Sequence, residues 1–299
     1  MPRPRDLDRE TALSWSAKAH AFVIEALMIE SAWTCKDIAF HGGTSLHLSW
    51  NSPRHSEDLD FLLSKEVSDL AKVMKSVERR VQERFLREDP KVVIEVKDRT
   101  RDEERMPYYQ VLISSKERTG KVMVKVEFWK VEPSYLAAYP TEFRTPLVPG
   151  DMVSSVRAPV PAARLASAFC DKLTAFATRP HLKWRDVFDL WWIATQTGER
   201  LEIEQVKAQF LHNVSGYNTR DGLSPGNALR KFLERSDDEI FAEAERDLRP
   251  WLPDSLWRQL YPETVREMVA YTRKALTTVA DYVEDAVEPE DALALKRAP

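Results

Sequence analysis

The sequence predicts an α/β (α+β) domain with a mixed sheet, followed by an α-helical C-terminal domain. Residues 1–160 contain short apolar runs, several with the alternation of strands, between segments with helical spacing. The stretch from Pro140 to Pro161 is rich in proline, which continues neither a helix nor a central strand, and it indicates a linker crossing. Residues 161–299 are mostly helical in pattern, so a domain boundary is expected between residues 160 and 161.

The first part of the chain is expected to alternate between helix and strand. Asp8 is a suitable N-cap for a helix whose apolar residues recur at helical spacing, and Asn51-Ser52-Pro53 has strong turn chemistry. A Gly-Gly turn separates the first strand from the second helix. The elements expected in order are a helix from Arg9 to Ala32, a strand from Ile38 to Phe40, a helix from Thr44 to Trp50 and a strand from Leu59 to Leu63.

An amphipathic helix and a β-meander are expected next. Between Val67 and Phe85 one stripe is apolar, while Lys72, Lys75 and Arg79 fall on the opposite face. Three strand-like runs follow, and together they are typical of a meander that closes a sheet. The stripe comprises Leu70, Val73, Met74, Val77, Val81 and Phe85, the runs are Lys91 to Val96, Tyr108 to Ser114 and Lys121 to Phe128, and the next helices cover Ala163 to Thr178 and Trp184 to Thr195.

Composition excludes several classes of protein. A chain of 299 residues with 43% hydrophobic content can bury a core, and 31% charged residues with 8 glycines argue against a fibrous repeat. Cys35 and Cys170 lie far apart without CxxC spacing, so a reducing, cytoplasmic environment is expected. No run approaches the roughly 20 apolar residues of a membrane span, so no membrane partner is expected. The net charge of −4 requires that any nucleic-acid binding rest on a local basic patch.

A glycine turn and a pair of carboxylates carry the strongest chemical signal. In Gly42-Gly43-Thr44-Ser45 the glycines let the backbone approach a ligand, and the helix that follows can present unpaired N–H groups to an anion. Asp58 and Asp60 project from the same side of a strand, because successive residues alternate between its faces. Such a pair can hold a divalent cation, which together with the turn indicates a nucleotide–metal site.

Three further charged residues have both functional and structural interpretations. Glu127 lies on a neighbouring strand, turned away from Val126 and Phe128, where it could complete a metal clamp or pair with Lys125. Lys172 stands in a helical run of small and apolar residues, where it could bind phosphate, snorkel, or pair with Asp171. Arg54 could neutralise phosphate or brace the carboxylates.

The chain resembles the AbiEii-type toxin nucleotidyltransferases, including the MenT-type toxins, within the DNA polymerase β-like superfamily. Their order and separations are similar, and the resemblance extends from the strand before Gly42 to Leu190. The matching blocks are Gly42-Gly43-Thr44-Ser45-Leu46, then Arg54-x-Ser56-x-Asp58-x-Asp60, then Asp171-Lys172-Leu173-Thr174-Ala175-Phe176 with Arg179, and finally Arg185-Asp186-Val187-Phe188-Asp189-Leu190. The C-terminal third is similar only in being helical.

The resemblance implies a role for each matched residue. Ser56 would touch the triphosphate, Asp58 and Asp60 would bind Mg²⁺ or Mn²⁺, and Lys172 would contact nucleotide phosphate. Asp186 would be a further essential acid that the helical domain contributes, with Lys172, to the active-site cleft. Glu127 departs from the superfamily, in which many members carry Asp as the third carboxylate. Asp186 and Asp189 share a helix face, and either could instead pair with Lys183 or Arg185.

The resemblance also implies the reaction. The substrate would be a nucleoside triphosphate, the acceptor the 3′ end of tRNA, and the consequence a block of translation by a toxin that has a cognate antitoxin. Two alternatives remain open from the sequence. One is a nucleotidyltransferase of the aminoglycoside-modifying kind with a small acceptor. The other is a non-catalytic module that keeps the fold and binds a nucleotide or a protein.

Overall fold

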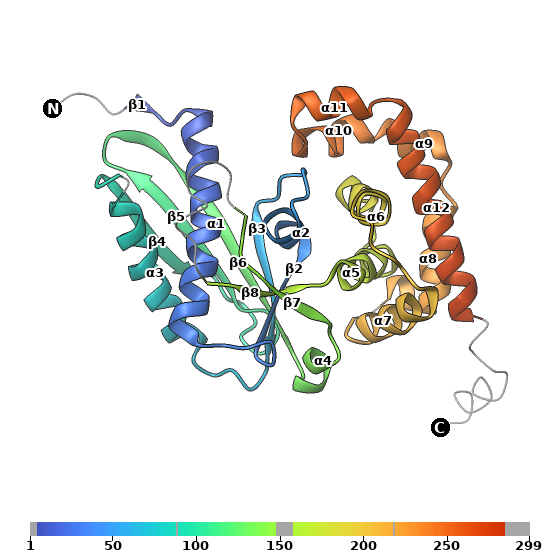
Figure 1. The fold of residues 1–299 in the computed structure, drawn as a ribbon, viewed down its shortest axis with the longest axis horizontal. Helices are drawn as coiled ribbons and strands as arrows, with labels where there is room; N and C mark the ends of the chain where they lie inside the picture. The colour runs from blue at the N-terminus through green and yellow to red at the C-terminus, as the bar shows by residue number, and fades with distance from the viewer. Residues whose placement is uncertain (1–4, 88, 148–157, 218, 285–299) are drawn as a thin grey trace. The chain divides into compact units, whose positions relative to one another are not determined.

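The computed structural model describes residues 5–87, 89–147, 158–217 and 219–284 and divides the chain into two compact units (Figure 1). The first unit comprises Met1–Arg164 and contains the sheet, and the described part of the second, Leu165–Pro299, is helical. A mixed sheet followed by helices confirms the predicted fold class. Among the described residues, every helix lacks the length or the hydropathy that a bilayer crossing requires.

The sheet of the first unit is mixed. Seven of its described strands follow the order β4-β5-β6-β3-β2-β8-β7, and β1 pairs with β6 outside this path. The pairs β3·β6 and β2·β8 are parallel, whereas β4·β5, β5·β6, β2·β3 and β7·β8 are antiparallel. The strands are β1 Arg5–Asp6, β2 Ile38–His41, β3 Asp58–Ser64, β4 Val92–Asp98, β5 Tyr108–Ser115, β6 Arg118–Val131, β7 Thr141–Arg144 and β8 Val160–Ala163.

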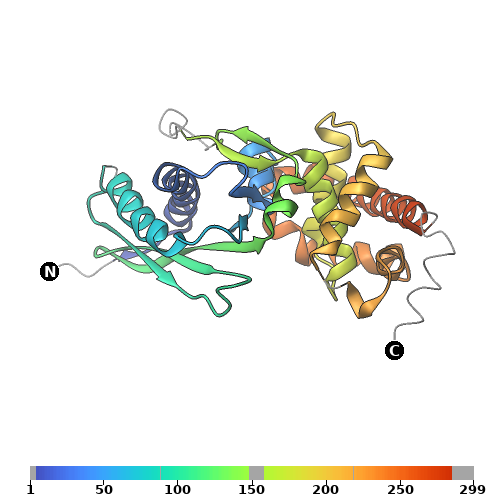
Figure 2. The same cartoon turned by 90° about the horizontal axis from the view of Figure 1, so that it is seen from below.

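Helices α1 (Arg9–Ser31) and α3 (Leu70–Leu86) pack against each other and cover one face of the sheet (Figure 2). Asp8 caps α1 by accepting a hydrogen bond from the Thr11 amide at 2.7 Å, as predicted. Every residue of the predicted apolar stripe on α3 is buried. The core beneath the helices includes the stacked rings of Phe61 and Phe128, whose centroids lie 5.4 Å apart. The covered face of the sheet is therefore the apolar one.

The predicted β-meander is confirmed as the antiparallel strands β4, β5 and β6. The glycine turn leads directly into helix α2 (Gly42–Trp50), which begins two residues earlier than expected, and its buried residues are Thr44, Ser45, Leu46, Leu48 and Ser49. A short helix, α4 (Pro133–Ala137), follows β6 and begins on a proline, which suits the first helical position. The carboxylates thus lie on β6, the last strand of the meander, and on its neighbour β3, against which α2 packs.

The prediction of a linker between Pro140 and Pro161 is wrong at both ends. Strands β7 and β8 form an antiparallel hairpin-like pair there, and Ala162 of β8 also pairs with Phe40 of β2. Pro161 lies opposite Phe143 in the pairing with β7, while β8 and β2 share the single register pair Ala162 and Phe40, so the missing amide interrupts no long ladder on the β2 side. Residues 148–157, the middle of the predicted linker, lie outside the described residues.

The second unit consists of helices that pack mainly around α5 and α12. The helices predicted at Ala163 to Thr178 and Trp184 to Thr195 are confirmed as α5 and α6, except that α5 begins at Leu165 and Ala163 belongs to strand β8. Trp184, fully buried at the start of α6, donates from Nε1 to the Ile240 carbonyl at 2.8 Å. The elements are α5 Leu165–Thr178, α6 Trp184–Gln196, α7 Ile203–Ser215, η2 Arg220–Gly222, α8 Pro225–Leu233, α9 Asp237–Ala242, α10 Ala244–Asp247, η3 Arg249–Trp251, α11 Asp254–Leu260 and α12 Glu263–Glu284.

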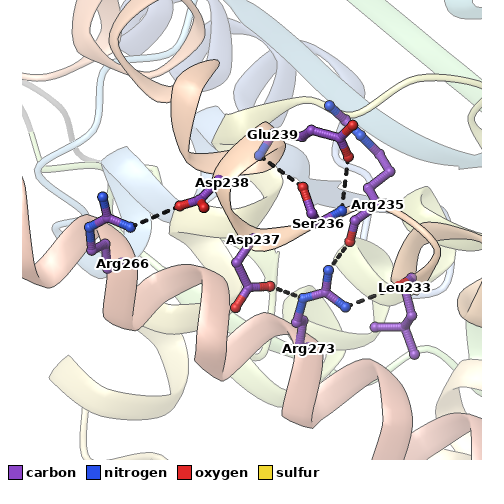
Figure 3. Close-up of polar contacts among 8 residues, drawn as sticks. All are labelled: Leu233, Arg235, Ser236, Asp237, Asp238, Glu239, Arg266 and Arg273. Atoms are coloured by element: carbon purple, nitrogen blue, oxygen red, sulfur yellow. Dashed lines mark hydrogen bonds and ion pairs between the residues drawn. The ribbon is translucent and has the colours of Figure 1, made fainter.

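Figure 3 shows how the turn between α8 and α9 is fastened to α12. The guanidinium of Arg273 donates to the Asp237 carboxylate, to the Arg235 carbonyl and, at 3.0 Å, to the Leu233 carbonyl. Ser236 and Glu239 form a capping box that begins α9. One arginine side chain therefore satisfies carbonyl groups at the end of α8 and a carboxylate at the start of α9.

Candidate active site

The turn between β2 and α2 requires glycine at two successive positions. Gly42 has a φ of +78°, which lies in the left-handed region, and a Cβ there would lie 2.5 Å from Asp60 Oδ2. A Cβ on Gly43 would meet the Arg54 guanidinium and lie 2.9 Å from Ser56 Oγ. The two glycines therefore let the backbone at the N-terminus of α2 approach the Asp60 carboxylate, Arg54 and Ser56.

Three polar side chains near the glycine turn donate hydrogen bonds to backbone carbonyls of the neighbouring segments. Thr44 Oγ1 donates to the Asp58 carbonyl, and Ser45 Oγ donates to the Phe40 carbonyl at 3.1 Å. Arg54 is 2% exposed and donates from Nη1 to the His55 carbonyl at 2.9 Å. The Arg54 contact is to a backbone carbonyl, so a role in bracing the carboxylates stays a prediction, and the contacts of Thr44 and Ser45 are structural. A nucleotide contact by any of the three stays a prediction.

Three carboxylates share one face of the sheet on adjacent strands. In the parallel pairing of β3 with β6, Asp58 is the register partner of Lys125 and Asp60 that of Glu127. Register partners point to the same face, so the carboxylates of Asp58, Asp60 and Glu127 lie opposite the face of the buried Leu59 and Phe61. The backbone thus assembles the three acidic residues that the sequence singled out.

These carboxylates are suited to a metal ion by their chemistry. Hard oxygen donors on neighbouring strands are the ligands that Mg²⁺ and Mn²⁺ prefer. The space that a Cβ on Gly42 would fill lies against Asp60 Oδ2, on the side of the α2 N-terminus. Among the described side chains, no group of three His, Cys, Asp or Glu residues is already gathered in coordinating geometry. The donor set fits the ion, and the coordination geometry is not preformed.

Lys125 is a member of this site that the sequence considered only as a partner of Glu127. Its Nζ lies 3.3 Å from Asp58 Oδ1, and both side chains are about one third exposed, at 38% and 34%. The carboxylate of Asp58 is the main cause that raises the pKa of Lys125. The alternation within β6 placed Lys125 on the same face as Glu127, but which residue of β3 it faces depends on the register.

A buried histidine fixes the start of the carboxylate strand. His20 of α1 donates from Nε2 to the Glu57 carbonyl at 2.9 Å, and Nε2 carries the proton because a carbonyl oxygen only accepts. Burial lowers the pKa of His20 to about 4, so the imidazole is neutral at pH 7. Burial also lowers the pKa of His47, whose ring packs against His55. Sequence reasoning missed His20, because its partner is a backbone atom 37 residues further along the chain.

In the second unit, Lys172 lies at the centre of a buried charge cluster. Its Nζ is 2.8 Å from Asp189 Oδ2 and 3.1 Å from Asp186 Oδ1, and Asp186 Oδ2 is 2.5 Å from Nη1 of Arg179. Asp189 is fully buried, whereas the Arg179 side chain is 42% exposed. The cluster therefore runs from a buried carboxylate to a partly exposed guanidinium.

This cluster contains contacts beyond the local pairings considered for these residues. Asp171, the expected partner in a local pair, accepts a hydrogen bond from Asn213 at 2.8 Å. The Arg185 guanidinium lies over the Trp251 ring, 4.2 Å from its centroid. Asp186 and Asp189 both pair with Lys172, as their shared helix face permits. Asp58, Asp60 and Glu127 belong to the first unit, and Lys172 and Asp186 to the second.

A glycine turn at a helix N-terminus beside strand carboxylates is the arrangement by which nucleotidyltransferases are recognised, and the chain belongs to that class. The family model described as "Nucleotidyl transferase AbiEii toxin, Type IV TA system" matches residues 31–287, so the chain is a member of the AbiEii family of nucleotidyltransferase toxins. Both the resemblance and the class of enzyme expected from the sequence are confirmed. No curated protein matches the chain.

Three solved structures share the fold over nearly the whole chain. MenT4, a nucleotidyltransferase toxin from Mycobacterium tuberculosis H37Rv, is 21% identical with a TM-score of 0.55, and the match covers 96% of this chain and 94% of that one. JHP933 from Helicobacter pylori is 18% identical with a TM-score of 0.53, covering 97% and 100%. A putative nucleotidyltransferase from H. pylori is 16% identical with a TM-score of 0.54, covering 94% and 100%. These likenesses show the fold.

Proposed function

We propose that this toxin transfers a nucleoside monophosphate from a nucleoside triphosphate to the 3′ end of tRNA, with Mg²⁺ or Mn²⁺ as cofactor, and so blocks translation until a cognate antitoxin neutralises it. The observation that carries the proposal is the approach of the α2 N-terminus to the carboxylate strand, where a Cβ on Gly42 would lie 2.5 Å from Asp60 Oδ2. A triphosphate and a cation require such neighbouring sites.

The first unit supplies the groups that would bind the nucleotide and the ion. The N–H groups of Gly42 and Gly43 lie in the first turn of α2, where the helix itself offers them no acceptor, and such groups favour an anion; Ser56 Oγ lies beside Gly43 as a further donor. Asp58, Asp60 and Glu127 would hold the divalent cation, which when bound neutralises triphosphate charge and favours ionisation of the attacking hydroxyl. Buried Arg54 donates to the carbonyl of His55, the residue before Ser56, and would hold this segment in place.

The second unit supplies Lys172 and Asp186 to the proposed function. Lys172 would contact nucleotide phosphate, and Asp186, which holds both Lys172 and Arg179, would set the position of the two cations. In the absence of phosphate the Lys172 ammonium is satisfied by Asp186 and Asp189. A phosphate ligand therefore has to share this ammonium with two carboxylates, which makes Asp186 a positioning residue.

The test is transfer of label from each α-labelled nucleoside triphosphate to total tRNA in the presence of Mg²⁺. We expect labelled tRNA with the wild-type protein and a loss of at least about a hundredfold in Asp58→Asn, since a metal-holding carboxylate is removed. Asp69→Asn is the matched control, because Asp69 is exposed and makes no cap hydrogen bond to α3.

Each other outcome has a distinct meaning. Label on a small acceptor such as an aminoglycoside, with tRNA unlabelled, would replace the tRNA acceptor by a small molecule. Nucleotide binding without transfer to any acceptor would contradict the proposed reaction and favour a binding module. Full activity of Asp58→Asn would show that the carboxylate pair is not needed for the reaction. Sequencing of tRNA 3′ ends after expression in cells identifies the added nucleotides.

A further inference from the structure

The carboxylate face of the sheet contains a positively charged side chain, that of Lys125. Lys125 of β6 is the register partner of Asp58, and its Nζ lies 3.3 Å from Asp58 Oδ1. Glu127, two residues further along the same strand, is the register partner of Asp60. One ammonium group and three carboxylates therefore share two neighbouring rows on a single face of the sheet.

The ammonium group offsets a charge imbalance that the sheet imposes. Neighbouring strands lie roughly 4.8 Å apart, so Asp60 and Glu127 place two like charges side by side, and Asp58 adds a third on the same face. Lys125 is the residue of β6 in the row of Asp58, and it reaches that carboxylate with a side chain that is only 38% exposed. The pair is therefore partly shielded from solvent.

The same carboxylate oxygen has a second proposed partner. Asp58 Oδ1 accepts from Lys125 in the protein as it stands, and the proposed function assigns the Asp58 carboxylate to a divalent cation. An ammonium and a divalent cation that share one carboxylate repel each other. The ammonium therefore opposes binding of the cation at Asp58, and the negative charge of an anion bound beside the cation would reduce this repulsion.

We propose that Lys125 is an internal counter-ion that pairs with Asp58 while the divalent cation is absent. Lys125 thereby weakens binding of the divalent cation alone and favours binding of that cation together with a nucleoside triphosphate. The inference rests on the metal role of Asp58 in the proposed function. Lys125 is accordingly a positioning residue that makes the site respond to the metal–nucleotide complex rather than to the free metal.

The test measures Mn²⁺ affinity by calorimetry or electron paramagnetic resonance, with and without a non-hydrolysable nucleoside triphosphate analogue. We expect Lys125→Gln to bind Mn²⁺ alone about fivefold more tightly than the wild type, as the loss of one partly exposed opposing charge implies. The tightening of Mn²⁺ binding that the analogue produces should shrink by a similar factor. Lys125→Arg keeps the charge and should resemble the wild type.

The matched control is Lys121→Gln, which removes a charge from the same face of the same strand at an exposed position. It should leave both Mn²⁺ affinities unchanged. If Lys125→Gln fails to fold, Lys125→Met retains the apolar stem and serves in its place. An unchanged Mn²⁺ affinity in Lys125→Gln, or an equal change in Lys121→Gln, overturns the inference while leaving the proposed function intact.

Failure of the proposed function has a different signature. Asp58→Asn should weaken Mn²⁺ binding if the carboxylate holds the cation. If Asp58→Asn binds Mn²⁺ as the wild type does, or if the wild type binds none at millimolar concentration, the metal role of Asp58 is wrong and the inference about Lys125 fails with it.

Discussion

At the scale of single residues, the site depends on close approach of backbone to side chain. Gly42 combines a positive φ with a position against the Asp60 carboxylate. The sequence predicted the glycine turn and the alternation that places Asp58 and Asp60 together, because both are local properties. It could not predict that Lys125 faces Asp58, because that contact follows from the register of two strands that are distant in the chain.

Gly42→Ala is expected to reduce nucleotidyl transfer through two effects, backbone strain and a clash with the Asp60 carboxylate. The substitution forces an alanine into the left-handed region, which costs about 1–2 kcal/mol, and places a methyl group against Asp60 Oδ2. We expect loss of nucleotidyl transfer together with a fall in the free energy of unfolding, measured by urea denaturation.

Gly198→Ala is the control for the strain alone. Gly198 has a φ of +74°, close to that of Gly42, but apart from its two chain neighbours no heavy atom of the described residues lies within 4 Å of the position of its Cβ. It should lower stability by the strain energy and leave transfer intact. Equal effects of the two substitutions on activity would show that the approach of Gly42 to Asp60 is unimportant.

At the scale of elements, amphipathic patterns were more informative than proline content. The buried stripe of α3 was predicted residue by residue, since one solvated face leaves a clear period in the sequence. Strand β8 was missed because Pro161 argues against a strand inside a sheet, yet β8 pairs with β7 over four residues that include Pro161 and with β2 at one register pair. The ends of the predicted linker therefore became sheet through tertiary pairing rather than local preference.

Arg273 is expected to be the main fastening of the α8–α9 turn to α12. Arg273→Ala removes hydrogen bonds to two carbonyl groups and one carboxylate, and its side chain is 26% exposed. We expect a loss of about 2–3 kcal/mol in the free energy of unfolding, measured by urea denaturation. Arg249→Ala, which breaks an exposed pair with Glu245, should cost under about 1 kcal/mol. Similar losses in the two variants would contradict this ranking.

At the scale of the whole molecule, the residues of the proposed function are divided between two compact units. The resemblance predicted Lys172 and Asp186, but the sequence did not reveal that Asp189 and Arg179 complete a buried cluster with them. The functional and structural interpretations of Lys172 are consequently not exclusive, because its ammonium compensates two carboxylates whatever else it binds.

Lys172→Met is expected to loosen the second unit as well as to stop transfer. It leaves Asp189, which is fully buried, without this partner, and breaking a buried ion pair typically costs about 3–5 kcal/mol. Hydrogen exchange should rise in residues 165–284 and stay unchanged in the sheet. Adding Asp189→Asn should restore part of the protection without restoring transfer. A rise of exchange in both units alike would show that they open together.

The parallel pairing of β3 with β6 also sets the order in which the site can be made. Two parallel strands need a long crossover, here α3 and the strands β4 and β5, so Asp60 acquires its neighbour Glu127 only after all of that chain exists. Ala162, still further along, has to pair with Phe40 before the strand that precedes the glycine turn is enclosed on both sides. On the ribosome, the carboxylate face therefore stays incomplete until Glu127 has been synthesised, and the strand before the glycine turn gains its second neighbour only at Ala162, past the middle of the 299-residue chain. A prematurely terminated product that lacks β6 and β8 carries the glycine turn without these neighbouring strands.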